Sequence, residues 1–179
     1  MLTQYLIDEF TDLVNASRPE AEYQRFIEEH PVFLDPLAAE ILPRARLGVE
    51  LVTDFVLRRH DYRYLVVEIE KPQDPIFTQK NDFTKEFTHA IGQVIDFQGW
   101  VADNVAYAQR HFPLIENPAG LLVMGHRSSL DDKQRAKLRR WCANSRTIEV
   151  LTFDDLAVRA DALHRSIRRR VRLFWGDAM

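Results

Sequence analysis

The first 40 residues carry the periodicity of helices. Apolar side chains recur at every third or fourth position over residues 2–15, which predicts an amphipathic helix. Ser17 followed by Glu20 resembles a capping box, so a second helix is expected to begin there and to run to about Glu29. Pro31 ends this helix, and a loop or short helical turn is expected over residues 31–40.

The pattern then changes to short runs rich in Val, Leu and Ile. They occupy residues 41–47, 49–57 and 64–70. Polar breaks near Gly48 and at 58–63 separate the runs. We therefore expect three strands in an antiparallel meander, with His60 and Asp61 at the tip of the second hairpin.

Helical and strand patterns alternate in the rest of the chain. We expect a loop at 72–82, a long helix at 84–109 and a strand at 120–125. A helix at 131–143, a strand at 147–153 and a final helix after 152 should follow. Ser129 with Asp132 and Thr152 with Asp155 are the expected caps of the last two helices. The order ααβββαβαβα predicts an α/β fold with a mixed central sheet flanked by helices.

Length and composition favour one domain over residues 1–179, because 46% of the chain is apolar and can form a sizeable core. Within it we expect N-terminal helices at 2–30, a sheet and crossover helix at 40–126, and a basic helical part at 127–179. Cys142 is the sole cysteine, which excludes an internal disulfide and a cysteine-based zinc site. The sequence lacks a membrane-length apolar run and a signal-peptide pattern, so a cytoplasmic protein without membrane contact is expected.

The net charge of −3 hides an asymmetry along the chain. Residues 126–179 contain 13 Lys and Arg against 7 Asp and Glu. A local excess of Arg suits phosphate recognition, so Arg168 and Arg169 are candidate substrate-binding residues. The alternative is that these arginines form a solvated helix face and favour the helix C-terminus electrostatically.

Acidic residues on two neighbouring expected strands are the main candidates for chemistry. Asp54 falls inside an apolar strand, where an isolated carboxylate is costly unless something positive meets it. Glu68 and Glu70 share one face of the next strand, and Lys71 follows at its end. If the hairpin closes near residues 60–61, Asp54 lies nearly opposite Glu68.

Opposed carboxylates repel each other unless a cation lies between them. Oxygen ligands of this kind suit Mg²⁺ or Mn²⁺, which bind through one or two carboxylates together with water and substrate phosphate. Such an ion could activate a water and stabilise the charge on an attacked phosphodiester. The alternative is a surface strand on which Glu68, Glu70 and Lys71 form exposed ion pairs, but this does not explain Asp54.

The acids and lysine on these strands resemble the core of the PD-(D/E)xK nucleases. More narrowly, five segments resemble the catalytic domain of the Shedu antiphage defence nucleases: FIEEHPVFL, TDFVL, VEIEKP, FTHAIGQVIDFQGW and VMGHR. They run in order over about 60% of the chain. The resemblance implies a restriction-endonuclease-like αβββαβ core with a mixed central sheet, in agreement with the order of elements predicted above.

The resemblance also assigns roles to the acidic strand residues. Asp54 matches the metal-binding aspartate, with Thr53 in place of the proline, and Glu68 matches the acidic residue of (D/E)xK. Glu70 stands where the lysine is expected, and Lys71 comes one position later. Either Glu70 fills the lysine's role, or a bulge or strand end turns Lys71 toward the metal. We favour the second alternative here, because a cation is otherwise missing beside the phosphate.

Two helices are implied to contribute to the same site. Gln93, with Phe97 four residues later, resembles the Q-x-x-x-Y element of RecB-like nucleases, with Phe in place of Tyr. His89 shares a helix face with Gln93, although a solvated stripe would look the same. Glu22 is the candidate for the metal-binding acid of the first core helix, with an ordinary exposed acid as the alternative.

Two further basic residues are candidates for substrate contact. Lys80 lies in the loop that follows the acidic strand, and Arg127 follows the strand ending at Gly125.

The function expected is that of a Mg²⁺- or Mn²⁺-dependent DNA endonuclease in antiphage defence. DNA, a second copy of the chain in a homo-oligomer, and a sensor or regulatory protein are the expected partners. The alternatives are a catalytically silent nucleic-acid-binding or regulatory module on the same fold, and a pure protein-interaction domain.

Overall fold

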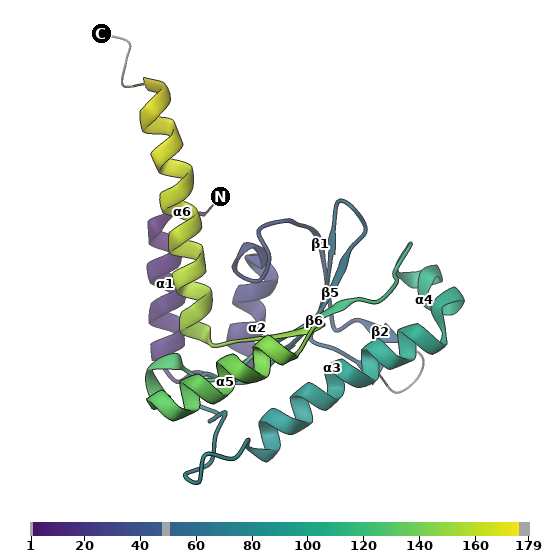
Figure 1. Cartoon of the computed structure of the whole chain (residues 1–179). Coiled ribbons are helices and arrows are strands. Elements are labelled where there is room, and N and C mark those ends of the chain that lie inside the picture. Colours follow the sequence, from purple (N-terminus) through teal and green to yellow (C-terminus); the bar gives the residue numbers. More distant parts are fainter. Residues whose placement is uncertain (1, 48–50, 176–179) are drawn as a thin grey trace.

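A five-stranded mixed sheet forms the centre of the molecule (Figure 1). The computed structural model describes residues 2–47 and 51–175, with side chains as far as Arg168. The strand order is β1-β4-β5-β6-β7, with bounds β1 Ala38–Pro43, β4 Phe55–Arg59, β5 Tyr64–Ile69, β6 Ala119–Val123 and β7 Ile148–Leu151. The first three strands pair antiparallel, and β6 and β7 continue the sheet in parallel. A separate two-stranded ribbon consists of β2 (Arg46–Leu47) and β3 (Leu51–Val52).

In the described ranges, six α-helices and two short 3₁₀ turns accompany the sheet. Their bounds are α1 Gln4–Asn15, α2 Glu20–Glu29, η1 Pro31–Phe33, α3 Lys85–Asp103, α4 Val105–His111, η2 Arg127–Ser129, α5 Asp132–Asn144 and α6 Phe153–Trp175. The predicted α/β class, the mixed sheet and the order of the core elements are confirmed. None of the described helices is both long and apolar enough to cross a membrane.

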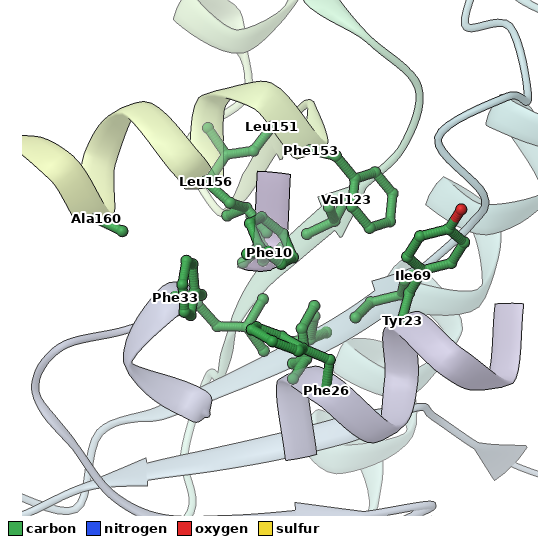
Figure 2. Close-up of a cluster of buried hydrophobic side chains, with 14 of the residues drawn as sticks. Phe10, Tyr23, Phe26, Phe33, Ile69, Val123, Leu151, Phe153, Leu156 and Ala160 are labelled. Carbon is green, nitrogen blue, oxygen red and sulfur yellow. The ribbon is translucent and has the colours of Figure 1, made fainter. Parts of the chain in front are cut away.

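One face of the sheet carries α1, α2 and α6. The buried side chains there include Phe55 of β4 and Val67 and Ile69 of β5, which alternate with residues on the other face. Figure 2 shows Phe10, Phe26 and Phe33 from the N-terminal elements packed in this core. The Phe10 and Phe33 rings are 4.5 Å apart between centroids, so the aromatic packing fixes α1 and η1 against the sheet.

The opposite face is covered by α3 and α5. Phe87, Ala90, Ile91 and Val94 of α3 contribute to a core with residues of β6 and β7. Farther along α3, Phe97 and Val101 pack with Val56 and Val66 of the central strands. In Figure 1, α6 runs beside α1 and its C-terminal part continues past that helix.

Several expected boundaries were wrong for local reasons. Pro19 is the N-cap residue of α2, since Ser17 adopts a left-handed backbone with a φ of 50°. The capping box of α5 pairs Asp131 with Gln134, whereas Thr152 and Asp155 bond reciprocally at α6 as expected.

Two expected elements are also interrupted. The helix over 84–109 breaks at Asn104 into α3 and α4. The expected strand over 49–57 is interrupted at 53–54, and the predicted break at Gly48 lies outside the described residues.

Gly120 of β6 allows α3 to lie close to the sheet. A Cβ atom at this position would come within 2.3 Å of Val94 Cγ1 and 3.2 Å of Ile148 Cγ1. We expect Gly120→Ala to lower the free energy of unfolding by about 1–3 kcal/mol, because the stiff Val94 side chain cannot move aside without disturbing the core.

Gly99→Ala is the matched control, because a Cβ there meets nothing within 4 Å and the site is an exposed helical position. It should raise stability by up to about 1 kcal/mol. Urea denaturation of both variants measures the difference, and equal stabilities would contradict close packing at Gly120.

Candidate active site

The candidate site lies where β4 and β5 separate. Their register pairs Phe55 with Val67 and, continued by one residue, places Asp54 opposite Glu68 as expected. Asp54 is not inside a strand, however: it lies in a bend between β3 and β4. The Thr53 hydroxyl donates to the Val67 carbonyl at 2.9 Å, and the Ile69 amide donates to Asp54 Oδ2 at 2.8 Å. The Asp54 side chain thus satisfies a backbone amide of β5 beyond the end of β4, and the Thr53 side chain adds a bond to the last residue that is paired with β4.

Helix α2 supplies a second support for Asp54. Gln24 Nε2 donates to Asp54 Oδ1 at 2.8 Å and also to Glu20 Oε1 at 3.0 Å. Gln24 and Glu20 are one helical turn apart, so they share a face of α2. The nearby Glu20 charge raises the pKa of Asp54, although burial is the larger cause and brings that pKa to about 6.

Glu68 is the most buried acid of the group, with 6% of its surface exposed. Within the described part of the chain, its Oε1 atom has no hydrogen-bond partner. Burial, and then the charge of Asp54, raise the pKa of Glu68 to about 8. A buried carboxylate with an unpartnered oxygen is costly unless a proton or a cation meets it.

Glu70 belongs to the same group of charges. Strand β5 ends at Ile69, and the Glu70 amide still donates to the Val123 carbonyl of β6 at 2.9 Å. Burial is the main cause that raises the pKa of Glu70 to about 7, followed by the charges of Glu20 and Asp74. The half-buried Glu70 carboxyl therefore lies among acids.

Lys71 is exposed, and its charge lowers the pKa of Glu70. Its carbonyl is fixed by a bond from the Gly125 amide at 3.2 Å, and the Gly125 carbonyl accepts from the Phe153 amide at 3.1 Å. Gly125 has a φ of 70°, and a Cβ there would come within 3.0 Å of the Asp74 carbonyl, so glycine is required.

The acids can hold a hard cation, although no ready-made cage is present. Among the described residues, no three His, Cys, Asp or Glu side chains converge closely enough to hold a metal ion by themselves. Mg²⁺ does not need such a cage, because it usually takes one or two carboxylates and completes its shell with water and phosphate. The all-oxygen donor set and the unpartnered Glu68 oxygen fit an ion of this kind.

Glu22 is not the α2 residue that reaches Asp54. The structure brings Gln24 and Glu20 to the group instead. Glu22 lies two positions from each of them, which is about 200° around the helix. The i, i+4 spacing of Glu20 and Gln24 was a signal in the sequence that could have identified them.

The expected substrate residues of α3 and its preceding loop lie apart from these bonds. His89 and Gln93 line a shallow groove on the outer side of α3, with Lys85 and Asp96. Lys80 is exposed at the tip of the loop between Phe77 and Phe83. None of the three forms a hydrogen bond to Asp54, Glu68 or Glu70 in the described regions.

The expected basic contacts have different environments. Arg127 forms a two-pronged ion pair with Asp155 at 2.6 and 2.9 Å, and its amide donates to Asp154 at 2.8 Å. These bonds join η2 to the start of α6. Arg168 is exposed on α6, whereas the side chain of Arg169 lies outside the described part.

The raised pKa values predict how stability depends on pH without metal. The unfolded chain releases the Glu68 proton near the ordinary pKa of 4.5, whereas the folded protein keeps it to about pH 8. The stabilisation is therefore complete below about pH 4.5 and is lost as the pH rises through 8. We expect the melting temperature in EDTA to fall from pH 5.5 to 8.5, and Glu68→Gln to flatten that fall.

Glu9→Gln, at an exposed glutamate of α1, is the control and should leave the slope unchanged. A Glu68→Gln profile as steep as that of the unmodified protein would contradict the raised pKa.

The solved structures that resemble this chain have low sequence identity to it. A repair endonuclease from Pyrococcus abyssi is 17% identical over 76% of this chain and 47% of its own, with a TM-score of 0.46. An EndoMS–dsDNA complex is 17% identical over 74% of this chain and 43% of its own, with a TM-score of 0.44. The chain thus spans about half the length of these structures.

The family comparison covers most of the sequence. No curated protein sequence matches the chain. The sequence model of the family described as "Shedu protein SduA, C-terminal" matches residues 17–157, which include α2, the five-stranded sheet and the acids Glu20, Asp54, Glu68 and Glu70. The resemblance to Shedu proteins is confirmed, and the chain belongs to the SduA C-terminal family.

Proposed function

We propose that the chain is a metal-dependent endonuclease that cleaves DNA in antiphage defence. The observation that carries the proposal is the buried, unpartnered Glu68 oxygen opposite Asp54, at the point where two strands separate. Family membership supports the defence role.

Asp54 and Glu68 would hold Mg²⁺ or Mn²⁺, with the Ile69 carbonyl as a further ligand. Glu20, and not Glu22, is the acid of α2 that shares Gln24 with Asp54. When bound, the ion activates a water and stabilises charge on the attacked phosphodiester. Glu70 accepts the water's proton, since a pKa of about 7 suits a base at neutral pH.

Contact with DNA through the basic surface of α6 is part of the proposal. Arg168 and Arg169 of α6 would bind DNA phosphates, while Lys80, His89 and Gln93 belong to α3 and the loop before it. A homo-oligomer and a regulatory partner remain predictions.

The catalytically silent module is the second candidate. It is favoured by the absence of three converging metal ligands among the described residues and by the displaced Lys71. The two candidates differ in cleavage, so the following plasmid assay separates them.

Asp54→Asn should lower the rate of plasmid nicking in Mg²⁺ by at least about a hundredfold. Loss of a residue that merely orients a metal ligand costs up to that factor, and loss of the ligand itself should cost more. The melting temperature without metal should stay within a few degrees, because Asn keeps the volume and removes a costly charge. Asp12→Asn, at an exposed position of α1, is the control. No nicking by the unmodified protein would favour the silent module, whereas nicking without any divalent metal would contradict the metal dependence.

Glu70→Gln and Lys71→Ala decide which residue fills the position of the family lysine. We now expect Glu70→Gln to slow cleavage by about 10²–10⁴-fold, the usual contribution of a positioned proton-transfer group. Lys71→Ala should keep most activity, because the exposed ammonium lies outside the buried group of acids. Rates at saturating Mg²⁺ measure both effects. Full activity in both variants would show that β5 is not the active strand.

A further inference from the structure

Gln24 is the neutral side chain of α2 that bonds to Asp54. Both of its contacts there use Nε2, which carries two hydrogens. One hydrogen is directed to Asp54 Oδ1 at 2.8 Å and the other to Glu20 Oε1 at 3.0 Å. The amide therefore bridges two carboxylates that would otherwise repel each other.

The backbone around Asp54 makes this bridge important. Asp54 lies in a bend between β3 and β4, so regular strand pairing does not orient its side chain. Oδ2 is held by the Ile69 amide, and Oδ1 is held by Gln24. With one donor on each oxygen, the carboxylate plane is fixed and each oxygen keeps a second lone pair for a cation.

Helix α2 is fixed by its packing, so it can hold Gln24 in one position relative to Asp54. Tyr23, Phe26 and Ile27 are buried in the core against the sheet. The Tyr23 hydroxyl oxygen accepts from the Arg18 amide at 2.8 Å and from Gln73 Nε2 at 3.2 Å. The position of Gln24 is thus set by the packing of its neighbours on the helix.

We propose that Gln24 is a positioning residue, which holds the Asp54 carboxylate in the orientation in which it binds the divalent cation that Asp54 and Glu68 share. The inference rests on the proposed function of the site. A neutral amide suits this role because it donates to both acids without supplying a charge that would compete with the ion.

The test is a Mn²⁺ titration of the melting temperature, which needs no DNA and no cleavage. Gln24→Met keeps the approximate size of the side chain and removes the donor. Its midpoint for the Mn²⁺-induced rise should move to a 10- to 100-fold higher concentration, about the effect of losing a partner that orients a metal ligand. Gln24→Asn keeps the amide but shortens the side chain, so the amide no longer reaches Asp54. Its Mn²⁺ midpoint should therefore be raised about as much as that of Gln24→Met.

Gln4→Met is the matched control. Gln4 donates to Asp8 at 3.0 Å with the same i, i+4 spacing, on the exposed side of α1. Its midpoint should equal that of the unmodified protein.

In plasmid cleavage, Gln24→Met should lower kcat by about 10- to 100-fold and leave the KM for DNA unchanged.

Each contrary result has a distinct meaning. A normal Mn²⁺ midpoint in both Gln24 variants would overturn the positioning role and leave the proposed nuclease intact. A loss of metal-free stability with a normal midpoint would make Gln24 a purely structural residue. If the unmodified protein shows no rise in melting temperature with Mn²⁺, the metal site itself is refuted, and the role of Gln24 with it.

Discussion

The separation of β4 from β5 is the constraint on which the rest of the site depends. Two paired strands normally use up each other's backbone donors and acceptors, which leaves little room for a carboxylate between them. Here the Asp54 carboxylate takes the place of a strand partner for the Ile69 amide, and the Thr53 hydroxyl adds a bond to the carbonyl of Val67, which is paired with Phe55. The strands can therefore diverge without leaving the Ile69 amide unpaired. This divergence brings Asp54 and Glu68 together at the edge of a rigid sheet, where their repulsion favours binding of a cation.

The fold could be predicted from the sequence because periodicity and composition agree along most of the chain. The run at 64–70 indicated the central strand β5, and Thr152 with Asp155 indicated the start of the last helix. Strand and helix boundaries were harder to predict where a few side chains decide them. Apolar residues continue on both sides of Thr53 and Asp54, so the pattern could not show that the strand is interrupted there.

The residues of the candidate site could be predicted from the sequence only in part, for a related reason. Asp54, Glu68 and Glu70 stood out because acids in apolar strands are unusual. Glu20 and Gln24 were missed, since polar residues on an amphipathic helix look alike whether they face solvent or a neighbouring strand. Arg127 shows the opposite error: a basic residue after a strand suggested phosphate binding, and the structure pairs it with Asp155. Contacts between distant segments decide both cases.

Gly125 ties two distant segments of the chain together. Its amide bonds to the carbonyl of Lys71, two residues after β5, and its carbonyl accepts from the amide of Phe153, the first residue of α6. The ion pair of Arg127 with Asp155, two residues beyond Gly125 and Phe153, joins the segment of Gly125 to α6 a second time. The start of the long C-terminal helix and the chain segment after Glu70 are therefore held side by side by the backbone of one glycine.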